Sequence, residues 1–213
     1  MDWSLYVITD AQLSRGRSHV EVIRAAIEGG ATVIQYREKE GTTRQLVEEA
    51  LALRELTREA GVPLIVNDRL DVALAVEADG VHVGQDDMSA VLTRRLMGRE
   101  RIVGVSATNL QEALQAERDG ADYLGVGPVF ATPTKPDAAP PMGLEGLAQV
   151  CRHVSIPVVA IGGINEHNAA MVIEAGADGV AVVSAVVAAP DVAAAARRLR
   201  EIVESARGSR GAR

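Results

Sequence analysis

Three polar side chains that can bind anions stand at alternate positions just after a short run of β-branched residues. They are Gln35, Arg37 and Lys39, and the run before them indicates a buried strand. Side chains alternate between the two faces of a strand, so we expect these three to point one way and Tyr36 and Glu38 to point the other way. An arginine binds two phosphate oxygens at once and a lysine adds a mobile charge, so this strand end is suited to a polyanion. The alternative is a solvated strand end with mixed charges.

Two aspartates follow two other apolar runs. Asp68 comes after Leu64–Val66, and Asp87 comes after Val81–Val83. If these runs are neighbouring strands, the two carboxylates can share one hard cation, and Mg²⁺ favours one or two carboxylates together with water and phosphate oxygens. Each aspartate could instead cap the helix that follows it, and Asp86 is an equal candidate for the second cap. The basic residues described above favour the metal site.

A glycine pair and a serine indicate a second anion site. Gly162 and Gly163 follow an apolar run and precede a predicted helix, so their backbone can approach a phosphate closely and donate N–H groups to it. Val183 and Ser184 end the last apolar run, and in many barrel enzymes the loops after the last two strands bind phosphate. A simple tight connection is the alternative interpretation of the glycine pair.

A long loop, Phe130–Met142, carries Thr132, Thr134 and Lys135. Loops of this length are often lids or binding loops, and a surface loop with a solvated lysine is the alternative. Ser106, which belongs to the segment GVSA, is either a turn hydroxyl or a phosphate contact. The sequence places no base near this serine that would make it a nucleophile.

The histidines and the single cysteine do not predict a metal site. His82 lies in the middle of an apolar run, and we expect a hydrogen-bonded core residue there. His19, His153 and His167 fall in or near predicted helices and have no metal-ligand spacing. Cys151 is expected to pack in a helix, and a lone cysteine excludes an intrachain disulfide and is typical of a reducing compartment.

The elements that position these residues form one repeating unit, in which a short apolar run is followed by a polar loop and a segment with helical periodicity. The expected strands are Leu5–Ile8, Val33–Gln35, Leu64–Val66, Val81–Val83, Ile102–Val105, Tyr123–Val126, Val158–Ile161 and Val180–Val183. Eight such units can close into a barrel, whereas a doubly wound sheet usually carries a glycine-rich phosphate loop after its first strand, where this chain has TDAQLSRGRS. The sequence therefore predicts one (β/α)8 TIM-barrel domain over residues 1–205, closed by a helix at Asp191–Glu204. A short flexible basic tail is expected over residues 206–213.

Composition limits the functional classes. The chain has 213 residues, which suits one large core, and with 2% aromatic residues we expect that core to consist of Val, Ile, Leu and Ala. A formal net charge of −7 argues against nucleic-acid or membrane-surface partners, so an anionic ligand needs a local basic pocket. The N-terminal region shows no long apolar span or signal-peptide pattern, and we expect a cytoplasmic protein.

Taken together, the strand-end motifs resemble those of the thiamine phosphate synthase family along nearly the whole chain. The motifs are QYREK (Gln35–Lys39), VND (Val66–Asp68), GVHVGQDD (Gly80–Asp87), GVSA (Gly104–Ala107), GPVFATPTK (Gly127–Lys135), AIGGI (Ala160–Ile164) and VVSAV (Val182–Val186). The resemblance implies a (β/α)8 enzyme that joins a hydroxymethylpyrimidine diphosphate to a thiazole phosphate and releases diphosphate. It implies a dissociative substitution, in which diphosphate leaves and the thiazole nitrogen attacks the pyrimidine methylene carbocation.

The resemblance also implies roles for individual residues. Those expected to bind the pyrimidine diphosphate are Gln35, Tyr36, Arg37, Glu38, Lys39, Asn67, Ser106 and Lys135, and those expected to stabilise the leaving diphosphate are Arg37, Lys39 and Lys135. Those expected to bind the thiazole phosphate are Thr132, Pro133, Thr134, Gly163, Val183 and Ser184, and those expected to hold Mg²⁺ are Asp68 and Asp87. Two alternatives are a thiazole tautomerase of the same superfamily and a non-catalytic protein that binds a phosphorylated metabolite. The complete set of clamp and metal residues speaks against the tautomerase.

Overall fold

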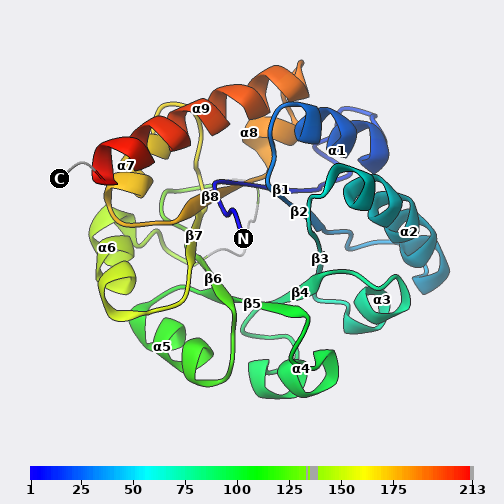
Figure 1. The fold of residues 1–213 in the computed structure, drawn as a ribbon, viewed down its shortest axis with the longest axis horizontal. Helices are drawn as coiled ribbons and strands as arrows, with labels where there is room; N and C mark the ends of the chain where they lie inside the picture. Colours follow the sequence, from blue (N-terminus) through cyan, green and yellow to red (C-terminus); the bar gives the residue numbers. More distant parts are fainter. Residues whose placement is uncertain (133, 135–138, 212–213) are drawn as a thin grey trace.

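The computed structural model describes residues 1–132, 134 and 139–211, and it shows a closed barrel of parallel strands ringed by helices (Figure 1). The strands are β1 (Leu5–Ile8), β2 (Val33–Tyr36), β3 (Leu64–Asn67), β4 (Gly80–Val83), β5 (Ile102–Ala107), β6 (Tyr123–Val126), β7 (Val158–Ile161) and β8 (Gly179–Val182). Each strand pairs with the next along the chain, and β8 pairs with β1 to close the barrel. The predicted (β/α)8 fold is confirmed, and every strand lies close to its expected position.

The helices cover the outside of the barrel. They are α1 (His19–Glu28), α2 (Thr43–Ala60), α3 (Leu70–Ala75), α4 (Ala90–Met97), α5 (Leu110–Arg118), α6 (Gly143–His153), α7 (Ala169–Glu174), α8 (Ser184–Val187) and α9 (Val192–Gly211). Ser18 and Thr42 begin α1 and α2 with complete capping boxes, which satisfy backbone N–H groups in the first turn. Within the described residues, no helix is long and apolar enough to cross a membrane.

Three aromatic side chains pack among aliphatic ones in the interior of the barrel. Trp3, which precedes β1, packs with Tyr6 of β1 and Tyr123 of β6, and the ring centroids of Trp3 and Tyr123 lie 4.4 Å apart. Gly104 on β5 makes room for this cluster, because a Cβ at that position would lie 2.2 Å from Cζ of Tyr123. The layer between strands and helices is mainly aliphatic, as expected. The barrel interior adds the three aromatic side chains to aliphatic ones such as Val33, Ile65 and Val159.

The last helix is longer than the sequence predicts. α9 extends to Gly211, so residues 206–211, expected in a flexible tail, continue the helix. Ala206 is buried, and the guanidinium of Arg207 contacts Asp2 and Ser4 near the start of the chain. α9 packs along α7 and α1 (Figure 1). These contacts join α9 to other parts of the chain, so the local composition of residues 206–211 does not reveal that they continue the helix.

Candidate active site

A cavity of about 540 Å³ opens at the carboxyl ends of the strands. Most of the residues expected to bind substrate or metal line it: Gln35, Arg37, Lys39, Asn67, Asp68, Asp87, Ser106, Thr132, Thr134, Gly163, Val183 and Ser184. Pro133 and Lys135 lie outside the described residues. The barrel therefore brings together side chains that are separated by as much as two thirds of the chain.

The alternation predicted along β2 is confirmed. Gln35, Arg37 and Lys39 line the cavity, whereas Tyr36 and Glu38 do not. The Tyr36 hydroxyl donates to Glu49 Oε2 at 2.7 Å, and Glu38 faces His19. Tyr36 and Glu38, expected among the pyrimidine-binding residues, therefore contact the surrounding helices, because the strand directs their side chains away from the barrel.

The two cations of this strand are held by carboxylates of neighbouring elements. Arg37 Nη1 lies 3.4 Å from Asp10 Oδ2 after β1, and the Arg37 backbone N–H donates to Thr9 Oγ1 at 2.8 Å. Lys39 Nζ lies 2.6 Å from Asp68 Oδ2 after β3. Arg37 and Lys39 thus reach the same cavity from fixed positions, which suits them to bind an anion there.

Asp68 and Asp87 do not cap helices. The N-cap residue of α3 is Arg69, which makes no side-chain cap, and the N-cap residue of α4 is Ser89, whose hydroxyl accepts from the Leu92 backbone N–H. Asp68 adopts a left-handed backbone with φ of 59°, which is uncommon for residues other than glycine and is found preferentially at functional sites. Since Arg69 and Ser89 are the N-cap residues of α3 and α4, the interpretation of Asp68, Asp86 or Asp87 as a helix cap is wrong.

The surroundings of Asp68 fit a cation. Burial and the neighbouring Asp87 carboxylate raise the pKa of Asp68, although Lys39 acts in the opposite direction. A carboxyl group whose ionisation is disfavoured by burial and by a second carboxylate gains most from a nearby positive charge. Two carboxylates from adjacent strands, open to a cavity lined by Arg37 and Lys39, are therefore suited to hold Mg²⁺ together with phosphate oxygens.

A buried chain of hydrogen bonds crosses the barrel beneath the cavity. Gln35 Nε2 donates to the Tyr6 hydroxyl at 2.9 Å, and the Tyr6 and Tyr123 hydroxyls lie 2.7 Å apart. His82 Nδ1 lies 2.8 Å from the Tyr123 hydroxyl, and His82 Nε2 lies 2.9 Å from Ser106 Oγ. The chain connects Gln35 on one wall of the cavity to Ser106 on the other.

One arrangement gives each buried hydroxyl hydrogen of this chain an acceptor. In it Tyr6, which accepts from Gln35, donates to Tyr123, and Tyr123 donates to His82 Nδ1. Burial lowers the pKa of His82 to about 4, so at neutral pH the ring is neutral and carries one proton. In this arrangement the proton is on Nε2, which donates to Ser106 Oγ and leaves the serine hydroxyl hydrogen to donate into the cavity.

The sequence gives no sign of a base near Ser106, but His82 Nε2 lies within hydrogen-bond distance of its hydroxyl. A buried imidazole whose pKa is lowered is a weak base, so the pair is not suited to act as a nucleophile and its base. The same bond makes His82, which the sequence correctly places in the core, a residue that orients Ser106.

The loops after β7 and β8 form the other end of the cavity. Gly162 and Gly163 have positive φ values of 98° and 67°, and a Cβ on Gly163 would lie 2.6 Å from the Ala131 carbonyl oxygen. The helix expected directly after these glycines begins only at Ala169. The segment before it is held by Asn168, whose Oδ1 accepts from the Asn165 backbone N–H and whose Nδ2 donates to the Gly163 carbonyl. Ser184 begins the short helix α8.

Three polar residues of the cavity were not singled out from the sequence: Tyr6, Thr108 and Asn165. Tyr6 follows from the alternation along β1, since Tyr6 and Ile8 face the interior while Leu5 and Val7 face the helices. Thr108 and Asn165 have no such signal, because each lies in a connection after a strand end.

The family model, the relatives and the solved structure that match this chain agree with one another. Residues 5–186 match the family model described as thiamine monophosphate synthase. A thiamine-phosphate synthase of Chloroflexus aurantiacus is 73% identical over 203 residues, covering 95% of this chain and 94% of that protein. One from Moorella thermoacetica is 62% identical over 206 residues, covering 97% and 98%. A solved structure of thiamine phosphate pyrophosphorylase from Pyrococcus furiosus superposes with a TM-score of 0.89 at 49% identity, covering 96% of this chain and 97% of that one.

Proposed function

The chain belongs to the thiamine monophosphate synthase family, and on that basis we propose that it joins a hydroxymethylpyrimidine diphosphate to a thiazole phosphate, giving thiamine phosphate and diphosphate. One observation carries the proposed site. Lys39 Nζ, which would bind the diphosphate, lies 2.6 Å from Asp68 Oδ2, which would hold the metal. Both residues line the same cavity. A metal-bound diphosphate needs both groups at one place.

The proposed roles follow from where charge changes during the reaction. As diphosphate leaves, negative charge grows on its oxygens, and Arg37 and Lys39 would bind and stabilise it. Lys135, outside the described residues, is proposed to add a third cation. Asp68 and Asp87 would hold Mg²⁺, which when bound supplies Lewis-acid charge to the same oxygens. The thiazole nitrogen then attacks the electron-poor methylene carbon, and no side-chain nucleophile is needed.

The remaining cavity residues would bind and orient the two rings. Gln35 and Ser106, linked by the buried chain, would hydrogen-bond to the pyrimidine, and Asn67 would contact its diphosphate. The residues proposed to seat the thiazole phosphate are Thr132, Pro133, Thr134, Gly163, Val183 and Ser184. Holding both reactants in one cavity supplies the proximity that a reaction between two molecules requires.

The cellular setting is also part of the proposal. A net charge of −7 and a single cysteine fit a cytoplasmic enzyme that acts on small phosphorylated metabolites, without nucleic-acid or membrane partners. The local basic residues of the cavity then account for anion binding by an acidic chain.

A product assay tests the function. Purified protein, Mg²⁺ and both substrates are mixed, and any thiamine phosphate is oxidised to its fluorescent thiochrome form. We expect fluorescence that disappears when EDTA removes the metal. Folded protein that binds thiazole phosphate but gives no thiochrome would reject the synthase and favour the tautomerase or a binding protein.

Tyr123→Phe tests the buried chain. This change removes the bond between the two tyrosine hydroxyls and leaves His82 Nδ1 without its buried partner, while Tyr6 keeps the bond from Gln35, so we expect the free energy of unfolding to fall by about 1–3 kcal/mol. Because Ser106 is then no longer oriented, the KM for the pyrimidine diphosphate should rise several-fold while the KM for the thiazole phosphate stays unchanged. Steady-state kinetics with each substrate varied in turn measure this difference. Equal changes in both KM values would contradict an orienting role.

A further inference from the structure

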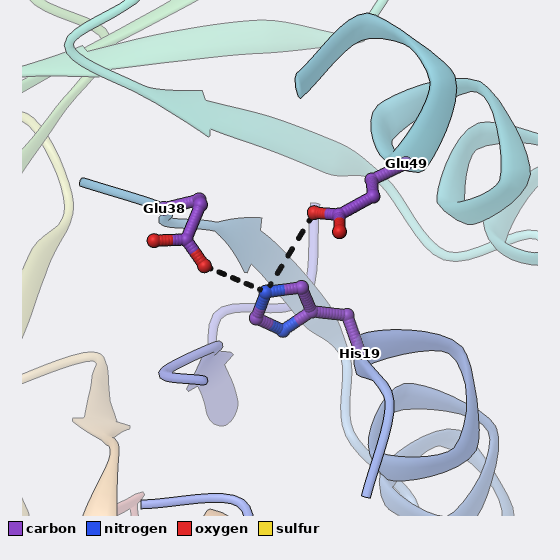
Figure 2. A group of neighbouring side chains, drawn as sticks. All are labelled: His19, Glu38 and Glu49. Carbon is purple, nitrogen blue, oxygen red and sulfur yellow. Dashed lines mark hydrogen bonds and ion pairs between the residues drawn. The ribbon is translucent and has the colours of Figure 1, made fainter. Parts of the chain in front are cut away.

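A second group of potential metal ligands lies outside the cavity described above. His19 begins α1, Glu38 follows β2, and Glu49 lies in α2. Figure 2 shows that both carboxylates point toward the same ring nitrogen of His19. His19 Nε2 lies 3.3 Å from Glu38 Oε2 and 3.9 Å from Glu49 Oε2. Among the described residues, these three offer one ligand atom each within 4.8 Å of one another.

The spacing of these atoms suits a shared cation better than direct ion pairs. A charge-assisted hydrogen bond between nitrogen and a carboxylate is about 2.7–2.9 Å long, and both separations exceed it. Ligands at about 2.1 Å from a tetrahedral ion lie about 3.4 Å apart, which is close to the 3.3 Å between His19 and Glu38. A small movement of Glu49, which is half exposed, brings the third ligand to this spacing.

Neighbouring groups already orient the three side chains. Glu38 Oε1 accepts from the backbone N–H groups of Lys39 at 2.7 Å and Glu40 at 3.0 Å, which leaves Oε2 directed at His19. The Tyr36 hydroxyl donates to Glu49 Oε2 at 2.7 Å. The His19 side chain is only 9% exposed, and its ring packs edge-on against Tyr36. Such outer contacts are what fix ligand geometry in metal sites.

An open, acidic cavity gives access to the group. The acidic residues that line this cavity of about 320 Å³ are Glu38, Glu40, Glu48 and Glu49, and none of the described residues that line it is a lysine or an arginine. The local potential is therefore negative and attracts cations from solvent. Arg37 and Lys39, which flank Glu38 in the sequence, line the other cavity and pair with Asp10 and Asp68.

We propose that His19, Glu38 and Glu49 bind a divalent transition-metal ion such as Zn²⁺ or Co²⁺, with water as the remaining ligand. One nitrogen and two carboxylate oxygens form a donor set that such ions favour over Mg²⁺. The ion joins α1, the connection after β2 and α2. Since Glu38 stands between Arg37 and Lys39, the ion also holds in place the backbone that carries both cations of the substrate cavity.

Titration with Co²⁺ tests the site, because a cobalt ion bound by imidazole in a low-coordinate site absorbs visible light. The titration is done in the Asp68→Asn, Asp87→Asn double variant, so that the oxygen ligands of the substrate cavity do not contribute. We expect one Co²⁺ per chain with visible absorption, and a binding constant weakened at least about tenfold by His19→Gln. Saturating Co²⁺ should also raise the melting temperature by about 5 °C or more.

His167→Gln is the matched control. His167 is 84% exposed and lies 3.7 Å from Glu166, and within the described part of the chain this pair has no third ligand, so its loss should not change the titration. Glu49→Gln, which keeps an acceptor for Tyr36, replaces His19→Gln if that variant does not fold. Identical titrations for the His19→Gln and His167→Gln proteins, or no Co²⁺-dependent absorption at millimolar metal, would overturn the proposal. These outcomes do not depend on whether the chain makes thiamine phosphate.

Discussion

Asp68→Asn is expected to reduce turnover about 100-fold or more while the barrel remains folded. The amide removes the negative charge that would hold Mg²⁺ beside the leaving diphosphate. Asparagine tolerates the left-handed backbone of this position, so the change introduces no new strain. The thiochrome assay and a thermal melt, run on the same preparation, measure both effects.

Without metal, we expect the Asp68→Asn protein to be at least as stable as the wild type. The pKa of Asp68 is raised in the folded protein by burial and by Asp87, so the ionised carboxyl destabilises the metal-free fold as the pH rises through that pKa. At neutral pH in EDTA, the melting temperature of Asp68→Asn should therefore equal or exceed that of the wild type. Mg²⁺ should raise the melting temperature of the wild type but not that of Asp68→Asn. Asp86→Asn is the control, since Asp86 is exposed and does not line the cavity. Wild-type turnover in folded Asp68→Asn would reject the metal site.

Arg37→Ala is expected to lower kcat/KM for the pyrimidine diphosphate by about 100- to 1,000-fold. Arg37 is the arginine that the strand alternation directs into the cavity, and its guanidinium can bind two oxygens of the leaving group at once. Arg37→Lys should recover only part of the loss, because an ammonium group lacks the planar pair of donors. Steady-state kinetics at saturating thiazole phosphate measure the effect.

Arg69→Ala is the matched control for this prediction. Arg69 also follows a strand at the same end of the barrel, but it pairs with Asp71 and Thr43 and does not line the cavity. We expect kcat/KM to stay within about twofold of the wild-type value, as for most surface substitutions. An equal loss in both variants would mean that general positive charge at this end, and not the position of Arg37, determines catalysis.

The sequence predicts the barrel and much of the cavity because both depend on local patterns. Apolar runs and glycine-terminated helices define the strand positions, and the carboxyl ends of parallel strands meet at one end of a barrel. The alternation along β2 correctly separates Gln35, Arg37 and Lys39 from Tyr36 and Glu38. The family motif QYREK contains all five residues. Only the alternation of side chains along the strand tells which of them face the cavity and which face the helices.

What the sequence does not reveal depends on contacts between distant segments. His19 has no metal-ligand spacing, since its partners Glu38 and Glu49 reach it from another strand end and another helix. Ser106 shows no base nearby, since His82 reaches it from the neighbouring strand. The aromatic interior is hidden in the same way, because Trp3, Tyr6 and Tyr123 meet only when the barrel closes. No local pattern encodes these juxtapositions.

The aromatic cluster in the barrel has a consequence for the order of events in the proposed catalytic cycle. Trp3, Tyr6 and Tyr123 pack in the barrel interior beneath the cavity, so the proposed substrates and products would enter and leave at the carboxyl ends of the strands. A ring seated between Gln35 and Ser106 would be covered by whatever binds above it. The molecule that binds deepest would then enter first and leave last. The sequence of arrivals and departures would in this sense follow from the packing of the closed barrel.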